Sequence, residues 1–196
     1  RARVQLVSEG NMYLDAALLL DEYLDVLAVK PAAYPAAGSF DVTIFDSVVL
    51  PRTAETGHVL YLNPQSGEHA PFDVGKTIKS DKRDTIGFDV VKTKHPIVRH
   101  LMLADVNVAK ARVLKGNKRS RAIGKSFRGT LLLAGRDAGR KYVALGFDVR
   151  DSDFPLRIAW PLFIVNVIDD FLDEDTRYVS SLRTGEVWKL PVAGKG

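Results

Sequence analysis

The sequence lacks cysteine altogether and contains only four histidines among its 196 residues. The absence of cysteine excludes a thiol nucleophile, thiolate metal ligands and disulfide bonds within the chain. The four histidines show neither the H-x-x-x-H spacing nor a comparable spacing of a zinc site. The sequence therefore predicts no bound metal and no cofactor.

Long uninterrupted apolar runs are missing as well. Arg157 and Asn166 break the best candidate, so no run reaches the roughly 18–20 residues that a membrane helix needs. The chain starts without an initiator methionine and ends in the linker-like LPVAGKG. We expect a soluble segment of a longer parent protein, with one domain over 1–175 and a hairpin or linker over 176–196.

The composition that is present is typical of a folded domain. Hydrophobic residues make up 46% of the chain and charged residues 27%, which suits a protein that buries a sizeable core. The net charge of +4 is a modest bias. It permits an anionic partner without requiring one.

Four apolar runs in the first third of the chain predict a mainly parallel α/β sheet. The runs are RVQLVS, LDVLAV, FDVTIFDSVVL and GHVLYL, and their continuous apolarity indicates strands covered on both faces. Between the first two runs, residues 11–22 have helical periodicity with Asn11 as the N-cap. The connections 31–39 and 47–56 barely reach the length of a helical crossover, so we expect reduced crossovers there.

A polar segment follows these apolar runs. Residues 64–86 show little periodicity and are expected to form a surface excursion. Further on, two β-runs flank the turn sequence RDAGR, which predicts an antiparallel hairpin over 129–149.

The stretch GFDVRDSDFPLRIAWPLFIVNVIDDFL combines three carboxylates with a long apolar run. Asp148, Asp151 and Asp153 suggest either a metal or acid–base site, or side chains that cap a helix. The spacing lacks the glycine and the distant glutamate of a calcium loop, so we favour capping by Ser152 and Asp153. The run then predicts a helix over 154–172, kinked at Pro161.

The same stretch also carries a resemblance. GFDVRDSDFPLRIAWPLFIVN, preceded by LLLAGRDAGRKYVAL, resembles the C-terminal part of BatA-like bacterial membrane proteins, which carry a von Willebrand factor A domain. FDVTIFDSVVLP, GHVLYLNP and KHPIV extend the resemblance upstream in the family's order, over residues 1–190. The resemblance implies a flavodoxin-like three-layer sandwich similar to class I glutamine amidotransferases. It also implies a parent chain that is anchored by transmembrane helices and faces the periplasm.

Amidotransferase chemistry needs a cysteine on a sharp turn, a histidine base and an acid that orients it. The equivalent turn is expected after HVLYLNP, where this chain has Gln65-Ser66-Gly67-Glu68-His69. Ser66 and His69 are the alternative nucleophile and base. The G-x-S-x-G elbow is missing, so we interpret this segment as a polar loop.

A basic tract without acids follows the middle of the chain: Lys110, Arg112, Lys115, Lys118, Arg119, Arg121, Lys125 and Arg128. Only Phe127 lies among these cations, and a nucleic-acid site would interleave more aromatic residues for stacking. We therefore interpret the tract as a solvated loop or a docking surface for a protein. An acidic cluster, Asp169 to Asp175, is its counterpart, and it forms either a solvated face or a surface for a basic partner.

Together these observations predict a non-catalytic interaction or scaffold module with no catalytic residues. Its expected partners are other protein domains, including the rest of its own parent chain, rather than nucleic acid. Two alternatives stay open. One is a hydrolase that uses Ser66 and His69 or a carboxylate pair, and the other is a module that binds anions, nucleic acid or lipid, through residues 110–128.

Overall fold

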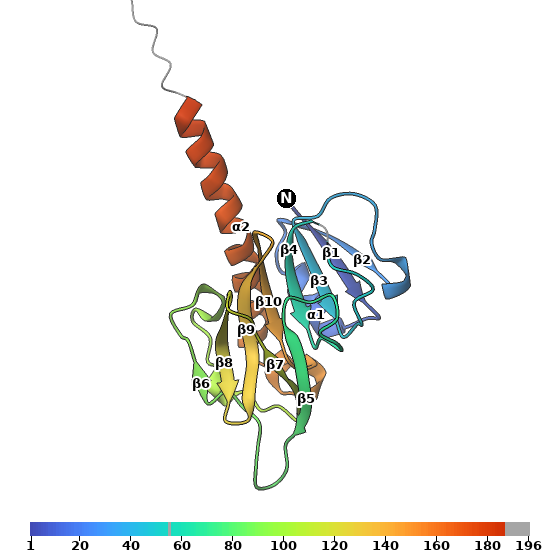
Figure 1. The fold of residues 1–196 in the computed structure, drawn as a ribbon, viewed down its shortest axis with the longest axis vertical. Helices are drawn as coiled ribbons and strands as arrows, with labels where there is room; N and C mark the ends of the chain where they lie inside the picture. Colours follow the sequence, from blue (N-terminus) through green and yellow to red (C-terminus); the bar gives the residue numbers. More distant parts are fainter. Residues whose placement is uncertain (55, 187–196) are drawn as a thin grey trace, which may run out of the picture.

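The computed structural model describes residues 1–54 and 56–186, with side chains through residue 173. The chain has the α/β class that the sequence predicts. A ten-stranded mixed sheet forms the centre, and two α-helices, α1 (Met12–Leu19) and α2 (Ala159–Glu186), accompany it (Figure 1).

Half of the sheet is parallel. Its neighbouring strands run in the order β2 (Leu24–Val29), β1 (Ala2–Ser8), β3 (Val42–Asp46), β4 (His58–Leu62) and β10 (Arg140–Leu145). Every residue of β3 and β4 is buried, which explains the continuous apolar runs in the sequence. The prediction of a parallel sheet is confirmed for this half.

The other half is antiparallel and larger than the predicted hairpin. Its strands are β5 (Asp73–Lys79), β6 (Val90–Val91), β7 (Lys110–Lys115), β8 (Ser120–Ser126) and β9 (Gly129–Asp137). The hairpin itself is confirmed. β9 pairs with β10, and Ala138 and Gly139 turn the chain with positive φ angles of 47° and 78°. Residues 64–86, expected to be a surface excursion, contribute β5 to the sheet.

Both helices lie on one face of the sheet. They share its larger core, in which Leu14 and Phe163 pack with Leu60, Ile123 and Val143. The opposite face has a smaller core around Phe45, Tyr61 and Phe72. Among the described residues, the connections over that face contain no α-helix, only a 3-10 helix at Pro31–Ala33. The reduced crossovers are therefore confirmed, but the second helical layer of a three-layer sandwich is not observed.

The helix ends differ in detail from the prediction. Asn11 caps α1, its side chain accepting from Leu14 N–H, as predicted. A separate 3-10 helix, Phe154–Leu156, precedes α2. Pro161 lies in the first turn of α2, where the backbone N–H groups have no partner within the helix. Its missing N–H therefore disrupts no helical hydrogen bond, and the reason for predicting a kink at Pro161 does not apply.

Beyond residue 172 the helix continues. Residues 176–186, expected to form a hairpin or linker, belong to α2, and residues 187–196 lie outside the described part of the chain. Within the described residues, none of the helices combines the length and apolarity that a bilayer-spanning helix requires.

Candidate functional site

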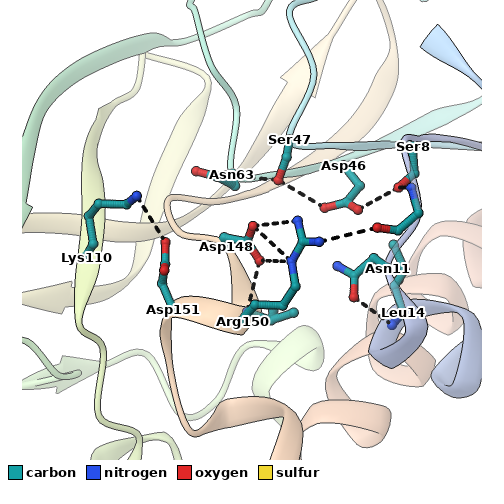
Figure 2. A network of polar contacts seen from close by, with 12 residues as sticks. Ser8, Asn11, Leu14, Asp46, Ser47, Asn63, Lys110, Asp148, Arg150 and Asp151 are labelled. Atoms are coloured by element: carbon teal, nitrogen blue, oxygen red, sulfur yellow. Dashed lines mark hydrogen bonds and ion pairs between the residues drawn. The ribbon is translucent and has the colours of Figure 1, made fainter.

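The carboxyl ends of the parallel strands carry a cluster of polar side chains (Figure 2). Ser8 ends β1, Asp46 ends β3, Asn63 follows β4 and Asp148 follows β10. In open α/β sheets, ligands bind outside the carboxyl ends of the strands. These side chains, the carboxyl-edge cluster, therefore occupy the position at which this type of sheet binds ligands.

Asp46 is the most buried carboxyl group of this cluster, with 3% of the residue exposed. Its Oδ2 accepts a hydrogen bond of 2.8 Å from the Ser8 hydroxyl, and its Oδ1 accepts one of 3.3 Å from Ser47. Burial raises the pKa of Asp46, and the hydrogen bond from Ser8 opposes that rise. The environment thus favours the neutral acid more than water does.

Two residues of the cluster have strained backbone conformations. Ser47 and Asn63 follow adjacent strands with φ angles of 56° and 47°, in the left-handed region that non-glycine residues seldom adopt. The Asn63 amide donates to Ser47 Oγ at 3.0 Å, so the two turns face each other. Ser47 therefore has a carboxylate and an amide as hydrogen-bond partners. No histidine donates to it or accepts from it within the described residues.

Asp148 and Arg150 form the second half of the cluster. Arg150 Nε and Nη2 donate to the two carboxylate oxygens of Asp148 at 2.9 and 2.7 Å. Arg150 Nη1 also donates to the carbonyl of Gly10, at 3.3 Å. Burial by itself would raise the pKa of Asp148, but the hydrogen bonds from Arg150 outweigh it and hold the pKa below its usual value.

The three carboxylates of the opening stretch do not meet in one place. Asp148 pairs with Arg150, Asp151 with Lys110 at 3.4 Å, and Asp153 with Arg157 at 2.7 Å. No group of three or more metal-ligating side chains occurs in the described part of the chain. Each carboxylate has its own cation, which leaves no shared site for a metal.

The predicted caps are correct for Ser152 and wrong for Asp153. Ser152 Oγ accepts from the N–H of Phe154 at 3.2 Å. Asp153 accepts instead from the backbone and side chain of Asn107 and pairs with Arg157. The Arg157 guanidinium, together with Asn107, holds the pKa of Asp153 well below its usual value.

Ser66 and His69 do not form a nucleophile–base pair. Ser66 Oγ accepts from the N–H of Glu68 at 3.0 Å, which closes a local turn. His69 has a positive φ of 63° and its Nε2 lies 3.8 Å from Glu68 Oε1. Among the described residues, no hydrogen bond joins Ser66 to His69.

The basic tract forms strands rather than a loop. β7 and β8 contain most of it, and three of its cations already have partners. Lys110 pairs with Asp151, Arg112 contacts Gln65, and Arg128 pairs with Asp84. The tract is thus distributed over β7, β8 and the adjoining turns rather than over a single loop.

Arg119 and Arg121 instead border a groove beside α2. The groove has a volume of about 490 Å³, and its lining includes five charged residues and one histidine: His95, Arg119, Arg121, Arg136, Lys141 and Asp170. Asp170 comes from the predicted acidic cluster, and it pairs with Lys141 at 3.2 Å rather than facing solvent alone. The sequence could not reveal this groove, because its lining is contributed by distant segments of the chain.

Neither a protein-family model nor a curated protein sequence matches the chain. Several solved structures do resemble it. Cytoplasmic Protein STM1381 from Salmonella typhimurium LT2 is similar with a TM-score of 0.67 and 12% identity, over 86% of this chain and 99% of that one. Cytoplasmic Protein STM3548 from Salmonella typhimurium gives a TM-score of 0.67 and 10% identity, over 87% of this chain and 99% of that one.

A larger protein contains a similar unit. The β-galactosidase from Bacillus circulans sp. alkalophilus matches 89% of this chain with a TM-score of 0.58 and 8% identity, but only 31% of its own length takes part. At such identities the likeness shows the fold alone, an α/β fold with a mixed sheet.

Proposed function

We propose that the chain is a non-catalytic interaction module built on a flavodoxin-like, amidotransferase-like α/β fold. The observation that carries the proposal is the pairing inside the carboxyl-edge cluster. Asp46 accepts from Ser8 and Ser47, and Asp148 is held by Arg150, so these side chains satisfy one another. A catalytic site keeps a nucleophile and a base directed at a substrate, and this edge instead uses its polar groups to join its own loops.

The proposed place of this module is a BatA-like, membrane-anchored bacterial protein, with the module in the periplasm. The resemblance of GFDVRDSDFPLRIAWPLFIVN to that family supports the proposal, and the order β2-β1-β3-β4-β10 supports the flavodoxin-like fold. A chain without cysteine also suits an oxidising compartment.

The edge strand β2 offers one surface to a partner. Within the described residues no strand pairs with its outer side, and Val26 and Leu27 are exposed. Edge strands are commonly protected by charged side chains, especially lysine, or by proline, and β2 contains one charged residue, Asp25, with no lysine or proline. We expect an extended segment of another protein to add there as a further strand.

Two measurements test the proposal. The purified chain should hydrolyse neither glutamine nor simple esters, and Ser66→Ala and Ser47→Ala should leave any background rate unchanged. Turnover that either substitution abolishes would establish the hydrolase alternative and refute the proposal.

The second measurement concerns binding. A pull-down of the full-length parent from its membrane should recover a protein that is lost when this segment is deleted, and lost again with Leu27→Lys. Exposed Lys76→Glu on β5 is the control and should retain the partner. An unchanged set of captured proteins after the deletion would contradict an interaction role.

A further inference from the structure

The groove beside α2 brings together cations from three adjacent strands. Arg136 on β9 lies directly opposite Lys141 on β10, and the N–H of Arg136 donates to the carbonyl of Arg119, the residue just before β8. Arg121 lies two residues further along β8, opposite Ala134. All four side chains therefore project from the same face of the sheet, the face that α2 covers.

Such a row is unfavourable by itself, because like charges on directly opposed residues of a sheet repel each other. Asp170 is the one acid among the described lining residues, and it is engaged by Lys141 through its carboxylate and its backbone carbonyl. The Arg119 and Arg121 side chains have no ion-pair partner among the described residues. An anion in the groove would offset this repulsion.

The shape of the groove suits a small ligand. Its volume of about 490 Å³ falls within the roughly 300–1,000 Å³ of small-molecule sites, and Pro96, Ala134 and Val143 supply apolar lining. Guanidinium groups are planar forks that bind phosphate oxygens in pairs. From these features we infer that the groove binds a phosphate-bearing ligand, either a soluble phosphorylated compound or a phospholipid headgroup, through Arg119, Arg121, Arg136 and Lys141.

His95 completes the lining as a neutral donor. Its Nδ1 accepts from the N–H of Ile97, which leaves Nε2 to carry the ring proton. Burial lowers the pKa of His95; the charge of Asp170 opposes this shift, and the charges of Arg121 and Lys141 add to it. A bound phosphate would add negative charge beside the ring and reverse part of that effect.

Nucleic acid is a poorer fit for this groove. Phe127 is the only aromatic residue of the basic tract, and it lies at the opposite end of β8 from Arg119 and Arg121, with 91% of its surface exposed. A single-strand site would place accessible aromatic side chains among its cations, whereas Tyr142, which also lines the groove, has only 2% of its surface exposed. The groove is also remote from the carboxyl-edge cluster, because it lies at the amino end of β10 and the cluster follows the carboxyl end. The inference therefore does not depend on the proposed function.

Binding of inorganic pyrophosphate and of vesicles with phosphatidylglycerol tests the inference, using the complete 196-residue chain. Calorimetry at low salt should detect pyrophosphate, and vesicles of phosphatidylcholine alone should not bind. Arg119→Glu/Arg121→Glu should weaken binding at least about tenfold, as expected for the loss of charge-assisted hydrogen bonds. Lys115→Glu/Lys125→Glu makes the same change of net charge outside the groove and should weaken it by less than about twofold.

The two sources of phosphate give different results. Binding of pyrophosphate identifies a soluble ligand, whereas binding of the anionic vesicles alone identifies a lipid headgroup. In the first case the NMR-detected pKa of His95 should rise when pyrophosphate is added, and His69 should not respond. The inference fails if the wild-type chain binds neither probe, or if the control pair weakens binding as much as the groove pair.

Discussion

At the scale of single residues, Asp46 shows how burial and hydrogen bonding compete. Burial raises its folded-state pKa, so the folded protein holds the proton more tightly than the unfolded chain does. The contribution of this group to the free energy of unfolding is therefore fully present below the unfolded-state pKa and is lost as pH rises through the folded-state pKa. At neutral pH the charge of Asp46 costs stability.

This reasoning predicts the behaviour of Asp46→Asn, which keeps the shape of the side chain and can still accept from Ser8. In urea unfolding at pH 7 the variant should be as stable as the wild type or more stable, and any advantage should shrink as the pH approaches about 4. Ser8→Ala is the matched control, because it removes the opposing hydrogen bond and should destabilise the protein at pH 7. An Asp46→Asn variant that is clearly less stable at pH 7 would mean that the hydrogen bonds to the carboxylate outweigh its desolvation.

At the scale of secondary-structure elements, the side of helix α2 that faces the sheet should contribute most of the stability that this helix provides. Phe163 has 1% of its surface exposed and packs against Phe154 and Trp160 at centroid distances of 5.8 and 6.2 Å. The neighbouring Leu162 is 40% exposed. Phe163→Ala should lower the free energy of unfolding by about 3–5 kcal/mol, and Leu162→Ala by less than about 1.5 kcal/mol. Equal losses in chemical denaturation would contradict this assignment of the buried side.

The elements also differ in how far the sequence predicts them. β3 and β4 are predictable because each is a short run that is apolar on both faces, and the β9–β10 hairpin is predictable because Asp137 and Gly139 mark its turn. β5 has one fully buried residue, Ile78, so its pattern does not differ from that of a polar loop. Its pairing with β7 spans a bulge and a long separation in sequence, which no local pattern encodes.

In the candidate sites too, features set by neighbouring residues can be predicted, and features set by long-range contacts cannot. The local capping of Asn11 and Ser152 can be read from neighbouring residues, and it is confirmed. The Asp148–Arg150 pair is also local, but the further hydrogen bond from Arg150 to the carbonyl of Gly10 joins distant segments of the chain, which no local pattern reveals. The groove depends on the register of three strands, so its four cations are visible only once the chain is folded.

At the scale of the whole molecule, the parallel and antiparallel halves share one core. Phe147, fully buried just after β10, contacts Phe88 from the antiparallel half at a centroid distance of 6.1 Å and Phe154 before α2 at 6.4 Å. The core that contains Phe147 also includes Val4 and Leu60 of the parallel strands and Ile78 and Ile123 of the antiparallel ones. A core that is continuous across both halves couples their unfolding.

We therefore expect one cooperative unfolding transition, although the two halves differ in strand direction. Far-UV circular dichroism, which reports the whole sheet, and tryptophan fluorescence should give the same midpoint in guanidinium. Phe147→Ala should lower the free energy of unfolding by about 3–5 kcal/mol, because its ring packs against both halves. Both midpoints should therefore fall together. Phe127→Ala, at an exposed turn, is the control and should leave both midpoints nearly unchanged. Two separate transitions in the wild type, or a Phe147→Ala variant that shifts one signal alone, would mean that the halves unfold as independent units.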